Sequence, residues 1–535
     1  MTAPLRRTEA RAVRDALRSR REIALVDVRE EDPYAQAHPL FAVQLAASRL
    51  ELDAPWRLPR QEVPVVVFDD GEGLALPAAQ KLQALGWTDV SLLAGGLEGW
   101  VRSGGEVFRD VNVPSKAFGE LVEHKRGTPS LAAEELKALQ DDGADLVVLD
   151  VRRYDEYRTM SIPGGTSVPG AELVLHARDL APNPATRIVV NCAGRTRSLI
   201  GAQSLVNAGL PNPMAALRNG TIGWLLAGYE LDHGRQRRFG PVSPASWLAA
   251  RADAQRLAEQ AGAARIDESG LARWTADTQR TLYRWDVRTP EEYLAGHRPG
   301  FGSAPGGQLV QETDVFAAVR GARIVLADGG RGSDGVRAPI TAHWLAQLGW
   351  EVAWLDAPQP AELELGAWRA ASTSPPEVDS VGVDELAALL ADEAVTLLNF
   401  DSGAEHVKGH IPGAWWALRS QLNAALAALP KPPQRLVATC GSGQLARFAA
   451  DDLRALSDVP VAVLDGGNAA WAVQGRPLEA GEQRLLSPRI DRYRRPYEGT
   501  GASREAMQAY LDWEFGLVAQ LARDATHNFQ VLAAA

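Results

Sequence analysis

The chain has 535 residues, 46% of them hydrophobic and 23% charged, and its formal net charge is −11 at pH 7. That length predicts roughly three to five domains of about 100–150 residues each, and the acidic balance argues against a partner such as nucleic acid or an anionic membrane. No apolar run approaches the roughly 20 residues of a membrane span, the first residues do not resemble a secretory signal, and only two cysteines are present. We therefore expect no membrane segment, no disulfide framework and a reducing, cytoplasmic location.

The same pattern of predicted elements occurs four times along the chain. Four apolar segments end in an aspartate: IALVDVRE at Asp27, LVVLDVRR at Asp150, TLYRWDVR at Asp286 and VTLLNFDS at Asp401. A second apolar segment follows each of them, and the residues directly after it are Asp69, Cys192, Asp328 and Cys440. The distance from the aspartate is 42 residues in the first three repeats and 39 in the last. An amphipathic segment and a third strand come next, ending in glycine-rich turns such as LLAGGLEGW, ALRNGTIGW and VLDGGNAAW.

Strands that alternate with helices at this spacing predict βαβ crossovers and a parallel sheet covered by helices on both faces. We therefore predict an α/β protein of four tandem domains, at residues 1–113, 127–240, 264–372 and 378–481. Residues 241–263 are expected to form a connecting helix, and VNVPSKAF, at residues 111–118, is expected to be a linker. Residues 482–535 are expected to form a basic arm and an amphipathic helix, which either docks on a neighbouring domain or makes a homodimer contact.

The stretch NCAGRTRS places Cys192 between a predicted strand and a predicted helix. The carboxyl end of a parallel strand opens into the crevice where α/β folds bind ligands, and a helix N-terminus there favours an anion. Gly194 permits a tight loop, and Arg195 and Arg197 offer planar recognition of an oxyanion. We expect these groups to lower the pKa of the Cys192 thiol, because a nearby positive potential favours the thiolate.

The ordered set of Asp-Val-Arg, a cysteine loop and a Gly-Gly-x-x-x-Trp turn resembles the rhodanese family of sulfurtransferases, in four copies up to about residue 481. Repeat four also contains GHIPGA at Gly409–Ala414, a segment similar to one found in that family. The resemblance implies four rhodanese-like domains and a thiosulfate sulfurtransferase without metal or cofactor. Cys192 would take a sulfane sulfur from thiosulfate and pass it to a thiol or cyanide. The implied substrate-binding residues are Ala193, Gly194, Arg195, Thr196, Arg197 and Ser198.

The other three loops differ from that of Cys192. Asp69 and Asp328 cannot carry a sulfane sulfur, so repeats one and three are predicted to be inactive. The loop CGSGQLA resembles the CGSGVTA loop of mercaptopyruvate sulfurtransferases. Two alternatives stay open for repeat four: a second active site, or a degenerate structural repeat, since Asp-Ser-Gly replaces Asp-Val-Arg there. The residues of this candidate second site are Cys440, Gly441, Ser442 and Gly443.

Three further alternatives apply to Cys192. A cysteine phosphatase would need an arginine six positions after the cysteine, where this chain has Ser198. Cys192 could also be an inert cysteine at the end of a buried strand, or the chain could be a persulfide carrier or scaffold with little turnover. Asp150, Arg152 and Glu156 are expected to form an ion-pair and capping cluster beneath the loop.

Overall fold

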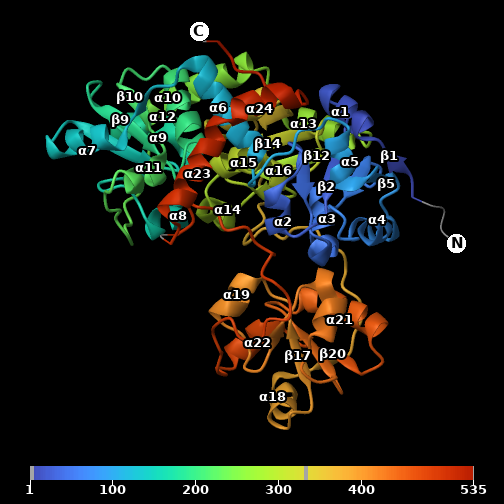
Figure 1. The fold of residues 1–535 in the computed structure, drawn as a ribbon. Helices are drawn as coiled ribbons and strands as arrows, with labels where there is room; N and C mark the ends of the chain where they lie inside the picture. Colours follow the sequence, from blue (N-terminus) through green and yellow to red (C-terminus); the bar gives the residue numbers. More distant parts are fainter. Residues whose placement is uncertain (1–4, 330–334, 500, 534–535) are drawn as a thin grey trace.

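The computed structural model describes residues 5–329, 335–499 and 501–533 (Figure 1). Each of the four repeats forms a five-stranded sheet whose strands all run parallel, in the orders β1-β5-β4-β2-β3, β6-β10-β9-β7-β8, β11-β15-β14-β12-β13 and β16-β20-β19-β17-β18. The prediction of four tandem α/β units is therefore confirmed. The fourth strand of each repeat is central in its sheet, so the loop that follows it lies at the middle of the carboxyl edge.

Repeat one begins the chain. Its strands are β1 (Arg7–Thr8), β2 (Ala24–Asp27), β3 (Ala42–Gln44), β4 (Val65–Phe68) and β5 (Val90–Leu93). Its helices are α1 (Ala10–Arg18), α2 (Glu31–Gln36), α3 (Leu50–Arg57), α4 (Ala75–Ala84) and α5 (Gly96–Arg102), with the short 3₁₀ turn η1 (Ala47–Arg49). Every residue of β2 and β4 is buried, as expected for the inner strands of a parallel sheet with helices on both faces.

Repeat two follows helix α6 (Val113–Arg126). Its strands are β6 (Ser130–Leu131), β7 (Leu146–Asp150), β8 (Thr166–Ser167), β9 (Arg187–Asn191) and β10 (Met214–Leu217). Its helices are α7 (Ala133–Asp141), α8 (Tyr154–Thr159), α9 (Leu173–Leu180), α10 (Thr196–Asn207) and α11 (Gly220–Leu226), with η2 (Gly170–Glu172).

Repeat three follows the connecting helix α12 (Pro244–Gln260), which confirms the helix expected at 241–263. Its strands are β11 (Ala264–Ile266), β12 (Leu282–Asp286), β13 (Gly302–Ser303), β14 (Arg323–Ala327) and β15 (Glu351–Leu355). Its helices are α13 (Glu268–Ala276), α14 (Pro290–Ala295), α15 (Gly306–Gln311), α16 (Thr313–Phe316) and α17 (Arg337–Gln347).

Repeat four and the tail complete the chain. The strands are β16 (Ser380–Val381), β17 (Thr396–Asn399), β18 (Trp415–Trp416), β19 (Leu436–Thr439) and β20 (Val461–Leu464). The helices are α18 (Val383–Ala391), α19 (Gly403–Lys408), α20 (Leu422–Ala427), α21 (Gln444–Leu456) and α22 (Gly467–Val473), with η3 (Arg419–Gln421). The tail contains α23 (Arg504–Phe515) and α24 (Leu517–Asp524).

The prediction of a linker at residues 111–118 is wrong, because most of that segment forms the first turns of α6. Pro114 lies in the first turn, where a missing N–H leaves no helical hydrogen bond unmade. The residues from Val113 to Val122 are buried, since α6 packs against α10, α23 and α24. The segment therefore belongs to the core between repeats and is not a solvated connection.

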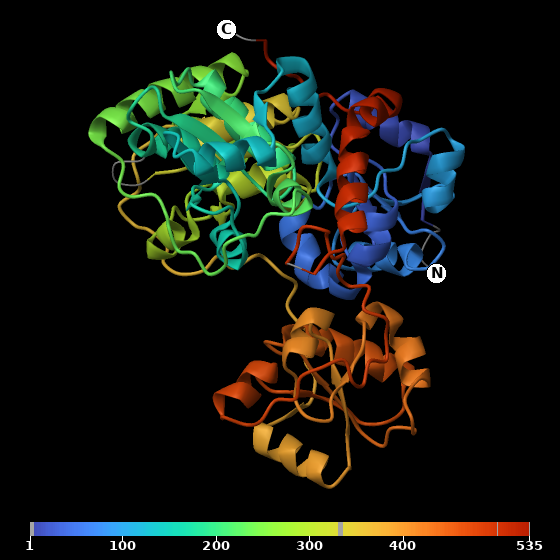
Figure 2. The same cartoon turned by 60° about the vertical axis from the view of Figure 1, so that its left-hand side comes forward.

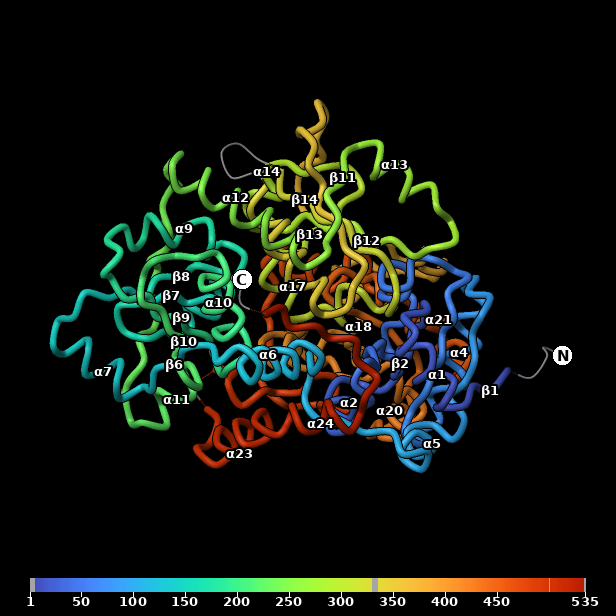
Figure 3. Tube along the Cα trace, turned by 90° about the horizontal axis from the view of Figure 1, so that it is seen from above, coloured from blue at the N-terminus to red at the C-terminus, as the bar shows by residue number. Residues whose placement is uncertain are grey.

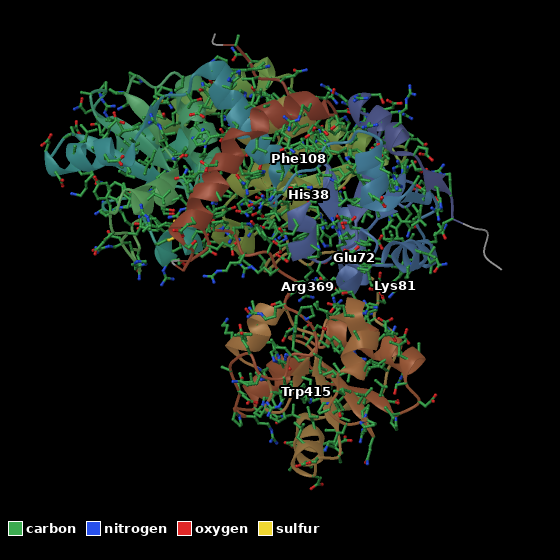
Figure 4. All side chains as sticks on the ribbon, viewed as in Figure 1. His38, Glu72, Lys81, Phe108, Arg369 and Trp415 are labelled. Atoms are coloured by element: carbon green, nitrogen blue, oxygen red, sulfur yellow. The ribbon has the colours of Figure 1, made fainter. Side chains whose placement is uncertain are left out.

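The first three repeats form one body and the fourth stands apart (Figures 1 and 2). Repeats one and three share a continuous hydrophobic cluster, and α12 packs against α9 and α17 to join repeats two and three. Repeat four docks on repeat one through Arg419, which donates to both carboxylate oxygens of Glu51 at 2.6 and 2.7 Å. Lys81 also contacts Glu51, at 2.7 Å; Figure 4 labels Lys81 at this junction and Trp415 within repeat four.

The tail returns from repeat four to the larger body, where α23 and α24 run beside α6 (Figure 3). Helix α23 also packs against α11 of repeat two, through a small cluster that includes Ile222, Met507, Tyr510 and Leu511. The docking of the tail on neighbouring domains is therefore confirmed, with two helices where one was expected.

Within the described residues, no helix combines the length and the apolar character that crossing a membrane requires.

Candidate active site

The Cys192 loop joins the central strand β9 to α10. Strand β9 ends at Asn191, and α10 begins at Thr196. The first turn of α11 holds the loop, because the N–H groups of Thr221 and Ile222 donate to the carbonyl oxygens of Cys192 and Ala193 at 2.9 and 3.0 Å. A Cβ on Gly220, whose φ is +52°, would lie 2.2 Å from the Cys192 carbonyl oxygen. The glycine-rich turn is therefore required for this close approach.

The Cys192 thiol is buried, with 2% of the residue exposed. Its Sγ lies 3.4 Å from Ser198 Oγ, and that hydroxyl donates to the Arg195 carbonyl oxygen at 2.8 Å. Burial raises the pKa of the Cys192 thiol, and the Arg197 charge and the hydrogen bonds with Ser198 oppose this effect without reversing it. The expectation of a lowered pKa is therefore wrong for this closed arrangement, in which removal from water outweighs the local positive potential.

Arg197 forms an ion pair with Glu156 of α8, with both guanidinium amino groups donating, at 2.8 and 2.9 Å. Burial acts to raise the pKa of Glu156, but the charge and hydrogen bonds of Arg197 outweigh it and lower that pKa to about 2. Arg197 also lines a polar cavity of about 210 Å³ between repeat two, the end of α15 and the C-terminal arm. Other charged side chains of this cavity are Arg152, Arg153, Asp155, Glu156, Glu312, Arg492, Arg495 and Glu498.

The Arg195 side chain is held in ion pairs within the protein. Its guanidinium donates to both carboxylate oxygens of Glu120 at 2.7 and 2.9 Å, and it also pairs with Glu123. Only 3% of the Arg195 side chain is exposed, and Phe515 of α23 lies on its guanidinium at 4.1 Å. Arg195 therefore ties the loop to α6 and to the tail, whereas the sequence suggested that it would contact an oxyanion.

Beneath the loop, the expected Asp150–Arg152 ion pair is present. Arg152 donates to the two carboxylate oxygens of Asp150 at 2.9 and 2.7 Å, and both side chains are 1% exposed. The same pair recurs in repeats one and three, between Asp27 and Arg29 and between Asp286 and Arg288. Glu156 has the expected capping role, since it accepts from the Arg153 N–H at the start of α8 at 3.2 Å, but its ion pair is with Arg197 and not with Arg152.

In repeats one and three the aspartate at the cysteine position fills its own loop. The Asp69 carboxylate accepts from the N–H groups of Leu74 and Ala75 at 2.6 and 2.9 Å. The Asp328 carboxylate accepts from Gly335, Val336 and Ala338, each at 3.0 Å. Residues 330–334 of that second loop lie outside the described residues. Both loops are therefore anion sites occupied by a side chain of the protein itself.

Repeat four requires a correction of register. Asn399, not Asp401, ends strand β17 and pairs with Thr439, in the place that Asp150 has beside Asn191. Asp401 therefore takes the position of Arg152, and the charge there is reversed. Its carboxylate accepts from the Gly441 N–H of the cysteine loop and from the Asn468 side chain, both at 2.6 Å.

We expect Asp401 to suppress the reactivity of Cys440. Burial raises the pKa of this thiol, the N–H of Ala446 opposes that rise from 3.4 Å, and the Asp401 charge adds to it. Replacement Asp401→Asn should therefore make alkylation of Cys440 by iodoacetamide about 3- to 10-fold faster at neutral pH, because a like charge disfavours the thiolate. Peptide mass spectrometry measures the rate, with Cys192 in the same sample as the unchanged reference. Equal rates for Cys440 in both proteins would contradict this role of Asp401.

The Cys192 loop alone keeps its backbone free of an internal carboxylate. In the part of the chain that the structure describes, no carboxylate accepts a hydrogen bond from a backbone N–H of residues 192–198. One thiol therefore stands in a loop whose N–H groups can receive an incoming anion, while the three sister loops hold Asp69, Asp328 or Asp401.

Comparison with known proteins agrees with this geometry. The model of the rhodanese-like domain matches residues 9–103, 132–227 and 382–474. The chain belongs to the rhodanese-like family. A crystal structure of thiosulfate sulfurtransferase from Pseudomonas aeruginosa is 60% identical and has a TM-score of 0.97, covering 99% of this chain and 100% of that one. The prediction of a rhodanese-family enzyme is thereby confirmed.

Two curated proteins also match parts of this rhodanese-family chain. The putative sulfur carrier protein YrkF of Bacillus subtilis is 28% identical over 125 residues, which are 21% of this chain and 64% of that protein. An uncharacterized 16.5 kDa protein of Synechococcus elongatus is 48% identical over 46 residues, which are 8% of this chain and 31% of that protein. The chain thus matches less than two thirds of the length of either protein.

Several residues around the loop were not predicted from the sequence. Glu120 and Glu123 lie on α6, in a region taken to follow a linker, and Tyr510 and Glu514 lie on the tail helix. The spacing of Glu120 and Glu123 on one face of an apolar helix was a usable signal, because buried carboxylates need a cation. No local pattern connects the tail to a loop more than 300 residues earlier.

Proposed function

We propose that this protein is a sulfurtransferase that moves a sulfane sulfur from thiosulfate to a thiol or cyanide through a persulfide on Cys192. The observation that carries the proposal is the contrast among the four loops, since Cys192 alone combines a thiol with backbone N–H groups that no internal carboxylate occupies. The thiosulfate sulfurtransferase of Pseudomonas aeruginosa, at 60% identity, supports the donor, and the putative sulfur carrier of Bacillus subtilis supports sulfane sulfur as the group transferred.

In the first half-reaction the Cys192 thiolate attacks the outer sulfur of thiosulfate. A new S–S bond forms on Sγ, the bond to the sulfonate sulfur breaks, and its electron pair leaves with sulfite. The buried thiol must ionise for this attack, so the loop N–H groups and Arg197 have to offset both the burial that raises its pKa and the negative charge of the incoming donor. The Arg197 charge opposes that rise, and we expect the same guanidinium to bind the donor oxygens.

In the second half-reaction an acceptor attacks the outer sulfur of the persulfide. The electron pair of the S–S bond returns to Cys192, which leaves the loop ready for another donor. Because donor and acceptor react in turn with the same sulfur, the kinetics are expected to be ping-pong.

The test is the mass of the purified protein before and after thiosulfate, resolved by peptide. We expect a gain of one sulfur atom on the peptide that contains Cys192 and none on the peptide that contains Cys440, together with one equivalent of sulfite. Loading of Cys440 alone would contradict the assignment. Loading of Cys192 without turnover on any small acceptor would favour a persulfide carrier or scaffold over an enzyme acting on free substrates.

A further inference from the structure

The tail helix α23 brings a buried carboxylic acid to the Cys192 loop. A Cβ built on Gly194 would lie 3.1 Å from Cε1 of Tyr510 and 3.3 Å from Oε2 of Glu514. Glu514 is 0% exposed. Glu514 therefore faces the Cys192 loop at Gly194, two residues after the cysteine.

One carboxylate oxygen of Glu514 has a partner and the other does not. Tyr510, one turn earlier on α23, donates its hydroxyl hydrogen to Oε1 at 2.7 Å. Oε2 is buried and has no hydrogen-bond partner among the described residues. An unsatisfied buried acceptor is costly unless a group arrives to use it, so its place against the loop indicates a functional reason.

Access from solvent is close by. Phe515, the next residue, is 52% exposed and lies on the Arg195 guanidinium. The solvent-exposed end of α23 therefore lies one residue from Glu514.

Resting on the function proposed above, we propose that Glu514 is the base that takes the proton from a thiol acceptor in the second half-reaction. The thiol S–H donates its proton to Oε2, and the resulting thiolate sulfur bonds to the outer persulfide sulfur. The bond from that sulfur to Cys192 Sγ breaks, and its electron pair stays on Sγ. The carboxylic acid then releases the proton to water, so no oxidant or reductant is needed.

The charged surroundings of Glu514 suit such a base. Burial raises the pKa of Glu514 to about 7, with Lys116 opposing that rise and Glu120 adding to it. A base whose pKa lies near the working pH is efficient, since it is free to accept a proton and does so readily. The titratable groups that face it are Lys116 and Glu120 of α6, Cys192 and Arg195 of the loop, and Tyr510 of its own helix.

The experiment starts from protein loaded with thiosulfate and freed of donor, so that ionisation of the Cys192 thiol does not enter the measurement. Single-turnover transfer is followed to N-acetylcysteine, which carries a proton on sulfur, and to benzenesulfinate, which carries none at neutral pH. Glu514→Gln keeps the shape of the side chain and removes its basicity. Glu505→Gln, an exposed change on the same helix, is the matched control.

We expect Glu514→Gln to slow transfer to the thiol roughly 30-fold at pH 7, because only the few per cent of thiol that is already ionised can then react. Transfer to benzenesulfinate should stay within about 3-fold of the wild type, and Glu505→Gln should change neither rate, as general acid–base assistance is confined to one step. In the wild type, thiol transfer should rise with pH up to about 7 and then flatten. In Glu514→Gln it should keep rising with the ionisation of the thiol.

Tyr510→Phe gives a second, independent readout. Its hydroxyl stabilises the ionised carboxylate, so its loss should move the midpoint of the wild-type profile to higher pH. An equal loss of both acceptors in Glu514→Gln, or an unmoved midpoint in Tyr510→Phe, would overturn the assignment of the base. Failure of the proposed function would look different, because no protein would then load sulfur on Cys192 or transfer it to either acceptor.

Discussion

Replacing Cys192 with serine is expected to abolish the release of sulfite from thiosulfate, by at least about 10³-fold, whether the acceptor is cyanide or a thiol. A serine hydroxyl is not ionised at neutral pH and cannot carry a sulfane sulfur, and loss of a covalent nucleophile generally removes most of an enzyme's rate. Serine is close in size to cysteine and its hydroxyl can keep the hydrogen bond with Ser198, so the loop should keep its shape. Initial rates of sulfite and thiocyanate formation measure the effect.

The matched control is Cys440→Ser, in the equivalent loop of repeat four. The Asp401 carboxylate already accepts from the Gly441 N–H in that loop, so we expect no donor to bind there. The activity of the Cys440→Ser variant should therefore stay within about 2-fold of the wild type, because the two loops are distant and independent. Retained activity in Cys192→Ser together with loss in Cys440→Ser would reverse the assignment of the two loops, and with it the choice of thiosulfate over mercaptopyruvate as donor.

The second large effect is expected from Arg195→Met, which removes a cation from between two glutamates. Glu120 is buried, and breaking a buried ion pair on one side costs about 3–5 kcal/mol, since the remaining charge loses its partner. The loss should fall on α6 and α10, which Arg195 joins. Native-state hydrogen exchange of their amides measures the free energy of local opening, a suitable quantity for a chain of several units, in which a single global value is not defined.

The double variant Arg195→Met/Glu120→Leu separates a structural role from substrate binding. Replacing both members of a buried pair with apolar groups is often neutral, so we expect most of the lost stability to return. If Arg195 is structural, the KM for thiosulfate should remain within about 3-fold of the wild type once stability is restored, since the substitution then removes no contact with the donor. A restored fold with a KM raised by more than about 30-fold would instead make Arg195 a donor-binding residue, as its place in the sequence first suggested.

The fold was accessible from the sequence because each repeat encodes it locally. Fully apolar strands, turn glycines such as Gly220 and aspartates at strand ends are short-range signals, and they recur at domain spacing. The same signals failed in repeat four, where Asp401 was taken as the strand end because an aspartate was expected there. Strand pairing moves that position to Asn399, which lies 440 − 399 = 41 residues before Cys440, so the shorter spacing of 39 from Asp401 was itself a signal of the shift.

The site was only partly accessible, because its chemistry depends on pairings between distant segments. Cys192 and its loop follow from one continuous stretch, but the state of Arg195 depends on Glu120 of α6 and on Phe515 of α23. The expected drop in the pKa of Cys192 considered the local positive charges and left out the degree of burial, which depends on how α6, α11 and α23 close around the loop. Ion pairing and burial are tertiary properties, and no periodic pattern reports them.

The position of α23 also sets the order in which the site is completed during synthesis. Residues 504–515 are translated more than 300 residues after Cys192. At about 5–20 residues per second, that interval is roughly 15–65 s, during which repeat two can fold with its thiol loop uncovered by the tail. A nascent chain therefore carries the Cys192 thiol without Tyr510 and Glu514 beside it until the tail has been made.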